Sequence, residues 1–329
     1  MHHLLLHGLH NIGFEDNYPA ERWATFLDPF FYIGVNGFVL ISGFFGIKFK
    51  ITGLYKLFIQ CAFYGLVGYL IHLYVDGAHI GRSIFNNCIT VFSFPPGWWF
   101  IQCYLYLYMC APLLNSAIAW MGKQQYGLVL SCVGILDIYF GWLRDNPIGQ
   151  GGYGLLHFIF LYLLGNYISQ YVAYRNLSGW VYAVCWLFLS VLLGALAVCN
   201  TCYWHKSCTV FNTHVYNHPL LIVSSLAFFL CFMRMNIRSN KVVNWLSSSC
   251  FAVYLIPENQ YIRRYIYTQI APLTQSFNPL RTFGLLIVIA MGIMILCLLF
   301  DKIRLFIMRP IDIPVNNALK AIDAKRRWC

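Results

Sequence analysis

The chain has 329 residues, of which 60% are hydrophobic and only 10% are charged. Ordinary soluble proteins carry roughly 25% charged residues, so this composition excludes a water-soluble domain and indicates a protein whose solvent is the lipid bilayer. The net charge of +11 fits the excess of lysine and arginine in the cytoplasmic loops of membrane proteins, and we therefore expect no nucleic-acid partner.

Apolar segments of about 20 residues, the length that crosses a bilayer, recur along the chain. We predict complete spans near residues 27–46, 53–75, 97–118, 125–145, 153–171, 178–199, 217–236, 242–262 and 280–301. The apolar segment 1–12 is a further span of only about 18 Å, and we expect the chain to begin partway through it. The predicted fold class is all-α, a polytopic transmembrane helix bundle of about ten spans, with the first one truncated.

The basic residues predict how this bundle lies in the membrane. If segment 1–12 runs from inside to outside, about two thirds of the 22 lysines and arginines fall on the cytoplasmic side, as the positive-inside bias requires. Both termini then lie in the cytoplasm, and the protein lies in the inner or plasma membrane of the cell. Residues 1–310 form the integral membrane domain, and residues 311–329 form a basic cytoplasmic tail suited to anchoring on anionic lipid.

Histidines gather at the N-terminus. His3, His7 and His10 recur at helical spacing, which places three imidazoles on one helix face. Imidazole is the natural general base near neutral pH, although histidines at the interfacial end of a span explain the pattern equally well. No carboxylate or cysteine of matching spacing completes a metal site beside them, so we expect no metal.

Two acids lie within or near predicted spans. Asp137 is a lone acid inside a span, and such a group is a functional candidate because burying it in lipid is costly. Its partner is not evident from the sequence. Glu258 lies at the outer end of a span, where an ion pair with Arg263 or Arg264 is the simpler interpretation.

Glycines and aromatic residues mark two further segments. Residues 34–46 predict a tight helix–helix seam, with Gly34, Gly37, Gly43 and Gly46 allowing close approach. Trp99 lies at the start of the span near 97–118, followed by Tyr104. An aromatic belt at the membrane interface explains these rings as well as a binding site does.

Several short motifs follow one another in an order that resembles a known family. They are His3 at the end of the first apolar segment, Ser42-Gly43-Phe44, Trp99-Phe100 followed by Tyr104 and Pro112, Leu246-Ser247 followed by Phe251 and Val253-Tyr254-Leu255-Ile256, and Asp301-Lys302-Ile303-Arg304. In the order of these motifs along the chain, the sequence resembles the acyltransferase-3 family of membrane-bound O-acyltransferases. Within that family it is similar to the bacterial polysaccharide and glycan O-acetyltransferases.

The resemblance implies transfer of an acyl group, most often acetyl, from acyl-CoA to a hydroxyl of a cell-surface carbohydrate. It implies that His3 is the catalytic histidine and that acyl-CoA is a co-substrate rather than a bound cofactor. The partners are then the lipid bilayer, acyl-CoA and a carbohydrate acceptor. We expect substrate or acyl-donor binding at Ser42, Trp99, Tyr104, Asp137, Tyr254 and Glu258, and attraction of the CoA phosphates at Lys48 and Lys50.

Two positions depart from the family pattern. The family's arginine, about three helical turns before the histidine, would precede Met1, and Pro257 stands where a histidine is common. An inactive, N-terminally truncated family member therefore remains an alternative. A transporter or flippase for a glycan or lipid is another, since it would use the same buried polar groups. The oligomeric state is left open.

Overall fold

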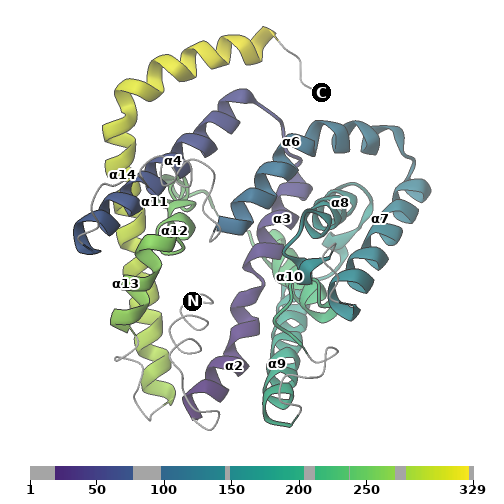
Figure 1. Cartoon of the computed structure of the whole chain (residues 1–329). Helices are drawn as coiled ribbons and strands as arrows, with labels where there is room; N and C mark the ends of the chain where they lie inside the picture. The colour runs from purple at the N-terminus through teal and green to yellow at the C-terminus, as the bar shows by residue number, and fades with distance from the viewer. Residues whose placement is uncertain are drawn as a thin grey trace.

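The computed structural model describes residues 19–76, 98–144, 149–203, 212–236, 238–270 and 279–325. The predicted N-terminal half-span, with His3, lies outside these ranges. Within them the regular structure is entirely helical, without a strand. Figure 1 shows the helices running side by side as a bundle, with the last helix bending across one end.

The helices follow the chain in this order: α2 (Pro19–Tyr32), α3 (Gly34–Phe45), α4 (Ile51–Asp76), α6 (Trp99–Trp120), α7 (Lys123–Ile138), α8 (Leu155–Tyr171), α9 (Gly179–Tyr203), α10 (Pro219–Arg234), α11 (Lys241–Ser247), α12 (Ala252–Leu255), α13 (Gln260–Ile270) and α14 (Pro279–Lys325). A short π-helix, Tyr139–Leu143, continues α7.

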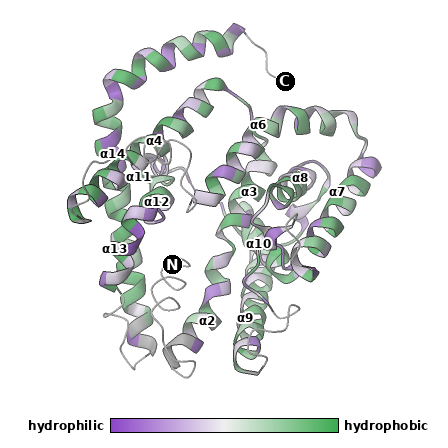
Figure 2. Cartoon of the chain, in the orientation of Figure 1, coloured by the Kyte–Doolittle hydropathy of each residue, from purple (hydrophilic) through white to green (hydrophobic). Residues whose placement is uncertain are grey.

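Five helical stretches among the described residues are long and apolar enough to cross a membrane. They are Arg22–Phe45, Ile51–Val75, Lys123–Leu143, Gly179–Cys202 and Phe283–Lys325. The shorter helix α10 is apolar as well, and Figure 2 shows hydrophobic residues along most of the bundle. The prediction of an all-α membrane protein is confirmed, whereas the count of about ten spans stays a prediction.

The predicted span 242–262 is not one helix. The chain here forms the short helices α11, α12 and α13, with turns at 248–251 and 256–258. Pro257 has no backbone N–H to continue a helix, and Asn259 starts the next one by accepting from Tyr261 N at 3.0 Å. Irregular backbone is tolerated at membrane depth where protein covers it, and Ser249, Glu258 and Asn259 are all buried.

Helices α3 and α8 touch through their backbones. A Cβ atom on Gly43 would lie 2.9 Å from the Cα of Tyr162, and one on Gly165 would lie 3.0 Å from Phe44 N. Such distances leave no room for a side chain, so these two glycines set the spacing of the helix pair. Gly34 and Gly37, by contrast, would meet nothing within 4 Å, so only part of the predicted glycine seam is a contact.

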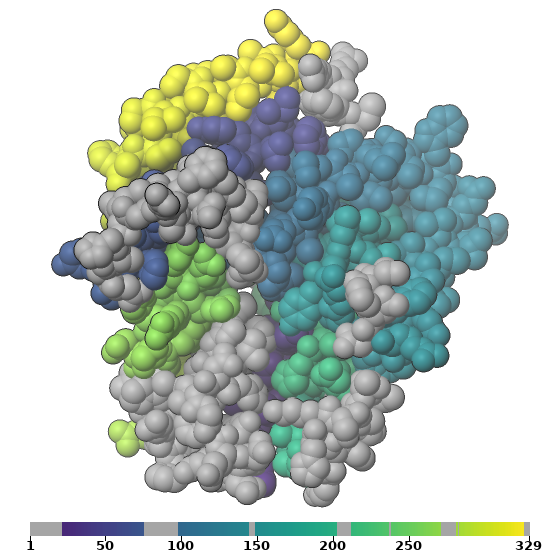
Figure 3. Space-filling view, in the orientation of Figure 1, coloured from purple at the N-terminus to yellow at the C-terminus, as the bar shows by residue number. Residues whose placement is uncertain are grey.

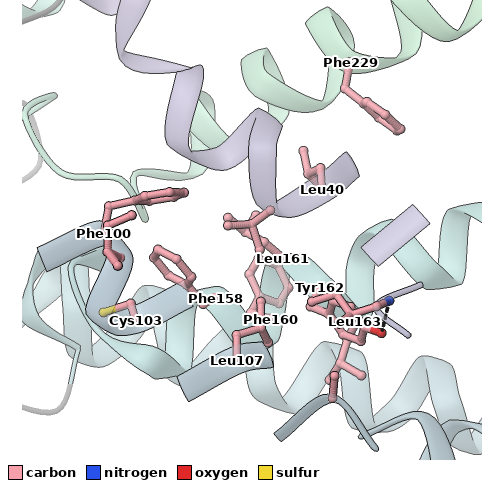
Figure 4. Packing of buried hydrophobic residues seen from close by; sticks show 14 of the residues in the cluster. Leu40, Phe100, Cys103, Leu107, Phe158, Phe160, Leu161, Tyr162, Leu163 and Phe229 are labelled. Carbon is pink, nitrogen blue, oxygen red and sulfur yellow. Dashed lines mark hydrogen bonds between the residues drawn. The ribbon is translucent and has the colours of Figure 1, made fainter. Parts of the chain in front are cut away.

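The main hydrophobic core surrounds this helix pair. Figure 4 shows side chains of α3, α6, α8 and α10 converging on one another. The labelled residues are Leu40, Phe100, Cys103, Leu107, Phe158, Phe160, Leu161, Tyr162, Leu163 and Phe229. The α3–α8 contact thus lies in the centre of the packing rather than at its edge.

Helix α14 extends well beyond a bilayer. Its 47 residues cover about 70 Å, more than twice the roughly 30 Å hydrocarbon core. Pro310 and Pro314 lie inside it, and proline is the usual cause of a helix bend. Figure 1 shows its C-terminal part crossing above α4. The basic tail predicted from residue 311 therefore continues the last helix, and we call residues 302–325 the C-terminal arm.

Asp323 joins this arm to the start of α4. Its carboxylate accepts from Ile51 N at 2.8 Å, from Thr52 N at 3.1 Å and from the Thr52 hydroxyl at 2.9 Å. The first N–H groups of a helix have no partner within the helix, so Asp323 supplies from afar the cap that a neighbouring residue usually provides. Partial burial alone would raise the pKa of Asp323, but these hydrogen bonds outweigh it and lower the pKa below its ordinary value.

We predict that Gly43→Ala destabilises the protein by about 1–3 kcal/mol, the usual cost of overpacking a filled core. The added methyl group must separate α3 from α8 at Tyr162. Gly37→Ala is the matched control, since it makes the same change in the same helix where nothing lies within 4 Å. Thermal unfolding in detergent measures both, and an equal melting temperature for the two variants would contradict the seam.

We predict that Asp323→Ala releases the C-terminal arm, so that trypsin cleaves at Lys320 faster than in the wild type. The Asp323→Asn variant retains a side-chain oxygen that can accept a hydrogen bond. Its rate of cleavage should therefore lie between those of the wild type and Asp323→Ala. Because the pKa of Asp323 is lowered, its contribution is fully present above the ordinary carboxyl pKa and is lost as pH falls through the lowered value. Identical cleavage rates for the three proteins would argue against the cap.

Candidate functional site

A cavity of about 640 Å³ opens between α2, α3, α4, α6 and the broken segment α11–α12. We call it the aromatic cavity. Its lining consists of Phe31, Tyr32, Gly34, Val35, Phe38, Leu57, Trp99, Phe100, Tyr104, Tyr216, Ser247, Ser248, Cys250, Phe251 and Tyr254. Three residues expected at a binding site, Trp99, Tyr104 and Tyr254, thus come together from α6 and α12.

Stacked rings form one wall of the aromatic cavity. The Tyr32 and Tyr216 rings are nearly parallel at 4.2 Å between centroids, and the Trp99 ring lies 5.3 Å from Tyr216. Tyr153 supports them from behind, since its ring lies 4.6 Å from Trp99 and its hydroxyl is 2.8 Å from that of Tyr32. These contacts fix the faces of the rings before any ligand arrives.

A glycine turn puts Tyr153 in this position. Gly151 and Gly152 have φ angles of +60° and +83°, a region that glycine adopts without the penalty other residues incur. The turn also lets Gly151 O accept from Tyr216 N at 2.8 Å. The loop carrying Tyr216 is therefore held against the start of α8.

Another part of the cavity wall is formed by α6 and α12. The rings of Phe100 and Tyr104, one turn apart on α6, are nearly parallel at 6.0 Å, and Phe100 also contacts Tyr254 edge-on at 5.5 Å. The Trp98 indole N–H donates to Leu255 O at 3.2 Å. The break after α11 thus lets α12 lie against α6 and present Tyr254 to the cavity.

Ser42 and Glu258 do not line the aromatic cavity. The Ser42 hydroxyl donates to Phe38 O, one turn back on α3, at 3.0 Å. Glu258 is buried, accepts from the Tyr267 hydroxyl at 3.3 Å and lies 3.7 Å from Arg263 Nη1. The ion pair predicted for Glu258 is therefore present, and it ties α13 to the preceding turn.

Asp137 has a buried partner that lies far from it in the sequence. His157 Nδ1 is 2.7 Å from Asp137 Oδ2, and both side chains are fully buried. Asn36 donates through Nδ2 to Tyr216 O at 3.0 Å, so its Oδ1 is left to accept from His157 Nε2, also at 3.0 Å. Both ring nitrogens of His157 therefore face oxygen atoms, one from Asp137 and one from Asn36.

This network of Asn36, His157 and Asp137 joins α3, α8 and α7 to the Tyr216 loop. Asn217 adds to it by donating to Asp137 O at 2.9 Å. Through Asn36, the network holds the backbone of Tyr216, a residue of the aromatic cavity wall, so it positions that wall. His157 was not among the residues predicted from the sequence. The sequence feature that could have identified His157 is a titratable side chain within the apolar segment at the start of α8.

Lys48 and Lys50 line a different cavity of about 830 Å³, at the turn between α3 and α4. Asn115, Asn166 and Gln170 also line it, together with Asp323 of the C-terminal arm. The carboxylate of Asp323 offsets part of the positive charge there. The predicted role of these lysines toward CoA phosphates stays a prediction.

Within the described ranges, no group of three or more His, Cys, Asp and Glu side chains is arranged to hold a metal ion. The histidines at positions 3, 7 and 10 lie outside these ranges. The predicted catalytic role of His3 is therefore carried forward as a prediction.

Comparison with known protein families gives a match over most of the chain. A family model described as an acyltransferase domain, that of acyltransferase family 3, matches residues 1–300. The matched region contains the whole aromatic cavity and the Asn36–His157–Asp137 network, and it ends just before the C-terminal arm. Neither the comparison with curated proteins nor that with solved structures gave a match.

We predict that His157→Ala destabilises the protein by about 3–5 kcal/mol, because it leaves the Asp137 side chain buried without its hydrogen-bonding partner. The double variant His157→Leu with Asp137→Leu should recover most of this loss, since replacing both members of a buried pair by apolar residues is often nearly neutral. Thermal unfolding in detergent compares the variants. A double variant no more stable than His157→Ala would show that the pair is not the source of the loss.

Proposed function

The chain belongs to the acyltransferase-3 family, whose model matches residues 1–300, and is a membrane acyltransferase. On this premise we propose that it moves an acetyl group from acetyl-CoA to a hydroxyl of a cell-surface carbohydrate. The identity of the acyl group, of its donor and of the acceptor is what we propose beyond the family. The observation that supports this proposal is the aromatic cavity.

The shape and lining of the aromatic cavity suit a sugar. Its volume of about 640 Å³ falls in the range of roughly 300–1,000 Å³ typical of small-molecule sites. The apolar C–H face of a sugar ring packs well on an aromatic face such as that of Trp99, which lines the cavity and is only partly buried. The hydroxyls of Tyr104, Tyr254 and Ser247 offer donors and acceptors for the sugar hydroxyls.

The proposed reaction needs a base and an acyl donor. His3 takes the proton of the acceptor hydroxyl, whose oxygen attacks the carbonyl carbon of the thioester. The carbon–sulfur bond then breaks, and the CoA sulfur leaves with the proton from the imidazole. Atoms and charges balance without a further reactant. His3 is assigned to this step by the family resemblance, and the described part of the chain supplies the acceptor-binding surface.

We predict that Trp99→Ala lowers kcat/KM for the carbohydrate acceptor about tenfold or more, the usual effect of removing an aromatic anchor worth about 1.4 kcal/mol or more. Trp120→Ala is the matched control, because Trp120 ends the same helix and is 90% exposed within the chain. The assay follows CoA thiol release by the reconstituted protein with acetyl-CoA and glycan. Equal losses in the two variants would contradict an acceptor site at Trp99.

We predict that His3→Ala abolishes acetyl transfer while leaving the melting temperature within a few degrees of wild type. Acetylation of surface glycans in cells that carry the variant provides the measurement. Intact acetylation together with reduced movement of a glycan or lipid across the membrane would reject the enzyme and favour a transporter.

A further inference from the structure

A second cavity, of about 470 Å³, lies between α4 and the C-terminal arm. We call it the basic cavity. Its lining consists of Lys56, Ile59, Gln60, Ser248, Arg304, Leu305, Arg309, Asp312, Ile313, Asn316, Asn317 and Lys320. Figure 1 and Figure 3 show the arm lying along the same end of the molecule as α4. Most of the cationic lining residues lie beyond residue 300, where the family match ends.

The charges of the basic cavity are only partly neutralised. Arg304 is paired through Nε with Asp301 at 2.7 Å, and the lining acid, Asp312, accepts from the Tyr55 hydroxyl at 3.1 Å. Among the described residues no ion pair engages Lys56, Arg309 or Lys320. The lining therefore holds four cationic side chains and one acid, an excess of positive charge that attracts an anionic ligand.

Asn316 adds a polar recognition group to these charges. Its Oδ1 atom is buried, and within the described part of the chain no donor lies in hydrogen-bonding range. A buried acceptor without a donor is costly, and a ligand with an N–H or O–H group would satisfy it. An amide side chain is well suited to the edge of an adenine base. Phosphates and a nucleobase together describe a nucleotide.

The basic cavity adjoins the aromatic cavity. Ser248 lines both of them, and its hydroxyl accepts from Lys302 Nζ at 2.8 Å. A ligand with an anionic head and a long uncharged arm would therefore find a cationic site and, past Ser248, an apolar one. Acyl-CoA is such a ligand, because its phosphates and adenine form an anionic head at one end and its thioester lies at the end of a long uncharged arm.

We propose that the basic cavity binds the phosphates of the acyl donor through Lys56, Arg309 and Lys320, and that the thioester arm passes Ser248 into the aromatic cavity. This inference rests on the proposed function, since it assumes that the donor is an acyl-CoA. A phosphate from a lipid headgroup has the same chemistry, and the test separates the two sources.

The test measures binding of CoA itself, which has no acyl group to transfer, to the full-length protein in phosphatidylcholine nanodiscs. The double variant Arg309→Glu with Lys320→Glu should weaken CoA binding at least about tenfold, the loss expected from removing one charge-assisted contact. The control variant Lys241→Glu reverses the charge of one exposed lysine at the start of α11 and should bind CoA as the wild type does. Removing the 3′-phosphate of CoA should also weaken binding to the wild type.

The outcomes separate this inference from the proposed function. If CoA binds the double variant as tightly as the wild type while wild-type acetyl transfer proceeds, the basic cavity is not the donor site and only this inference fails. If added phosphatidylglycerol stabilises the wild type but not the double variant, while CoA binding is equal, the cavity is a lipid-headgroup site and the inference is again overturned. If the wild type binds no CoA at all, the proposed donor fails with it.

Discussion

The backbone contact between α3 and α8 is the constraint on which the site depends. Because Gly43 and Gly165 carry no side chain, Tyr162 lies against the end of α3, where its hydroxyl accepts from Ile47 N at 3.1 Å and donates to Asn115 of α6 at 2.6 Å. The same approach sets Asn36 opposite His157. One close helix pair therefore fixes α6 and the Tyr216 loop, which together carry much of the aromatic cavity wall.

The two cavities differ in chemistry, as the two ends of the proposed amphiphilic donor do. The aromatic cavity is apolar, with hydroxyls at its edges, whereas the basic cavity is cationic and borders the C-terminal arm. The break between α11 and α12 makes both possible, since it turns Tyr254 toward α6 and leaves Ser248 between the cavities. Irregular structure at this point serves the site, in the way that broken helices serve other membrane proteins.

The sequence predicted what depends on local composition. Spans such as 53–75 follow from length and hydropathy, and α4 and α9 are close to their predicted bounds. The broken span was predicted as one helix, because a hydropathy window averages over Pro257 and the serines before it. Trp99, Tyr104 and Tyr254 were selected through the family resemblance, and no periodicity predicted that they would share a cavity. The partner of Asp137 was missed because His157 lies on the next helix, and contacts between helices leave no period in the sequence.

Whether the aromatic cavity receives the acyl end of the donor is the question on which both proposals depend. An acyl-CoA whose acyl chain carries a diazirine tests it directly, because irradiation marks the residues nearest to the reacting group and mass spectrometry locates them. We expect labels on peptides from residues 98–104 and 247–256, and loss of these labels when excess CoA competes. Labels confined to the lipid-exposed faces of α7 and α9, unaffected by CoA, would contradict it.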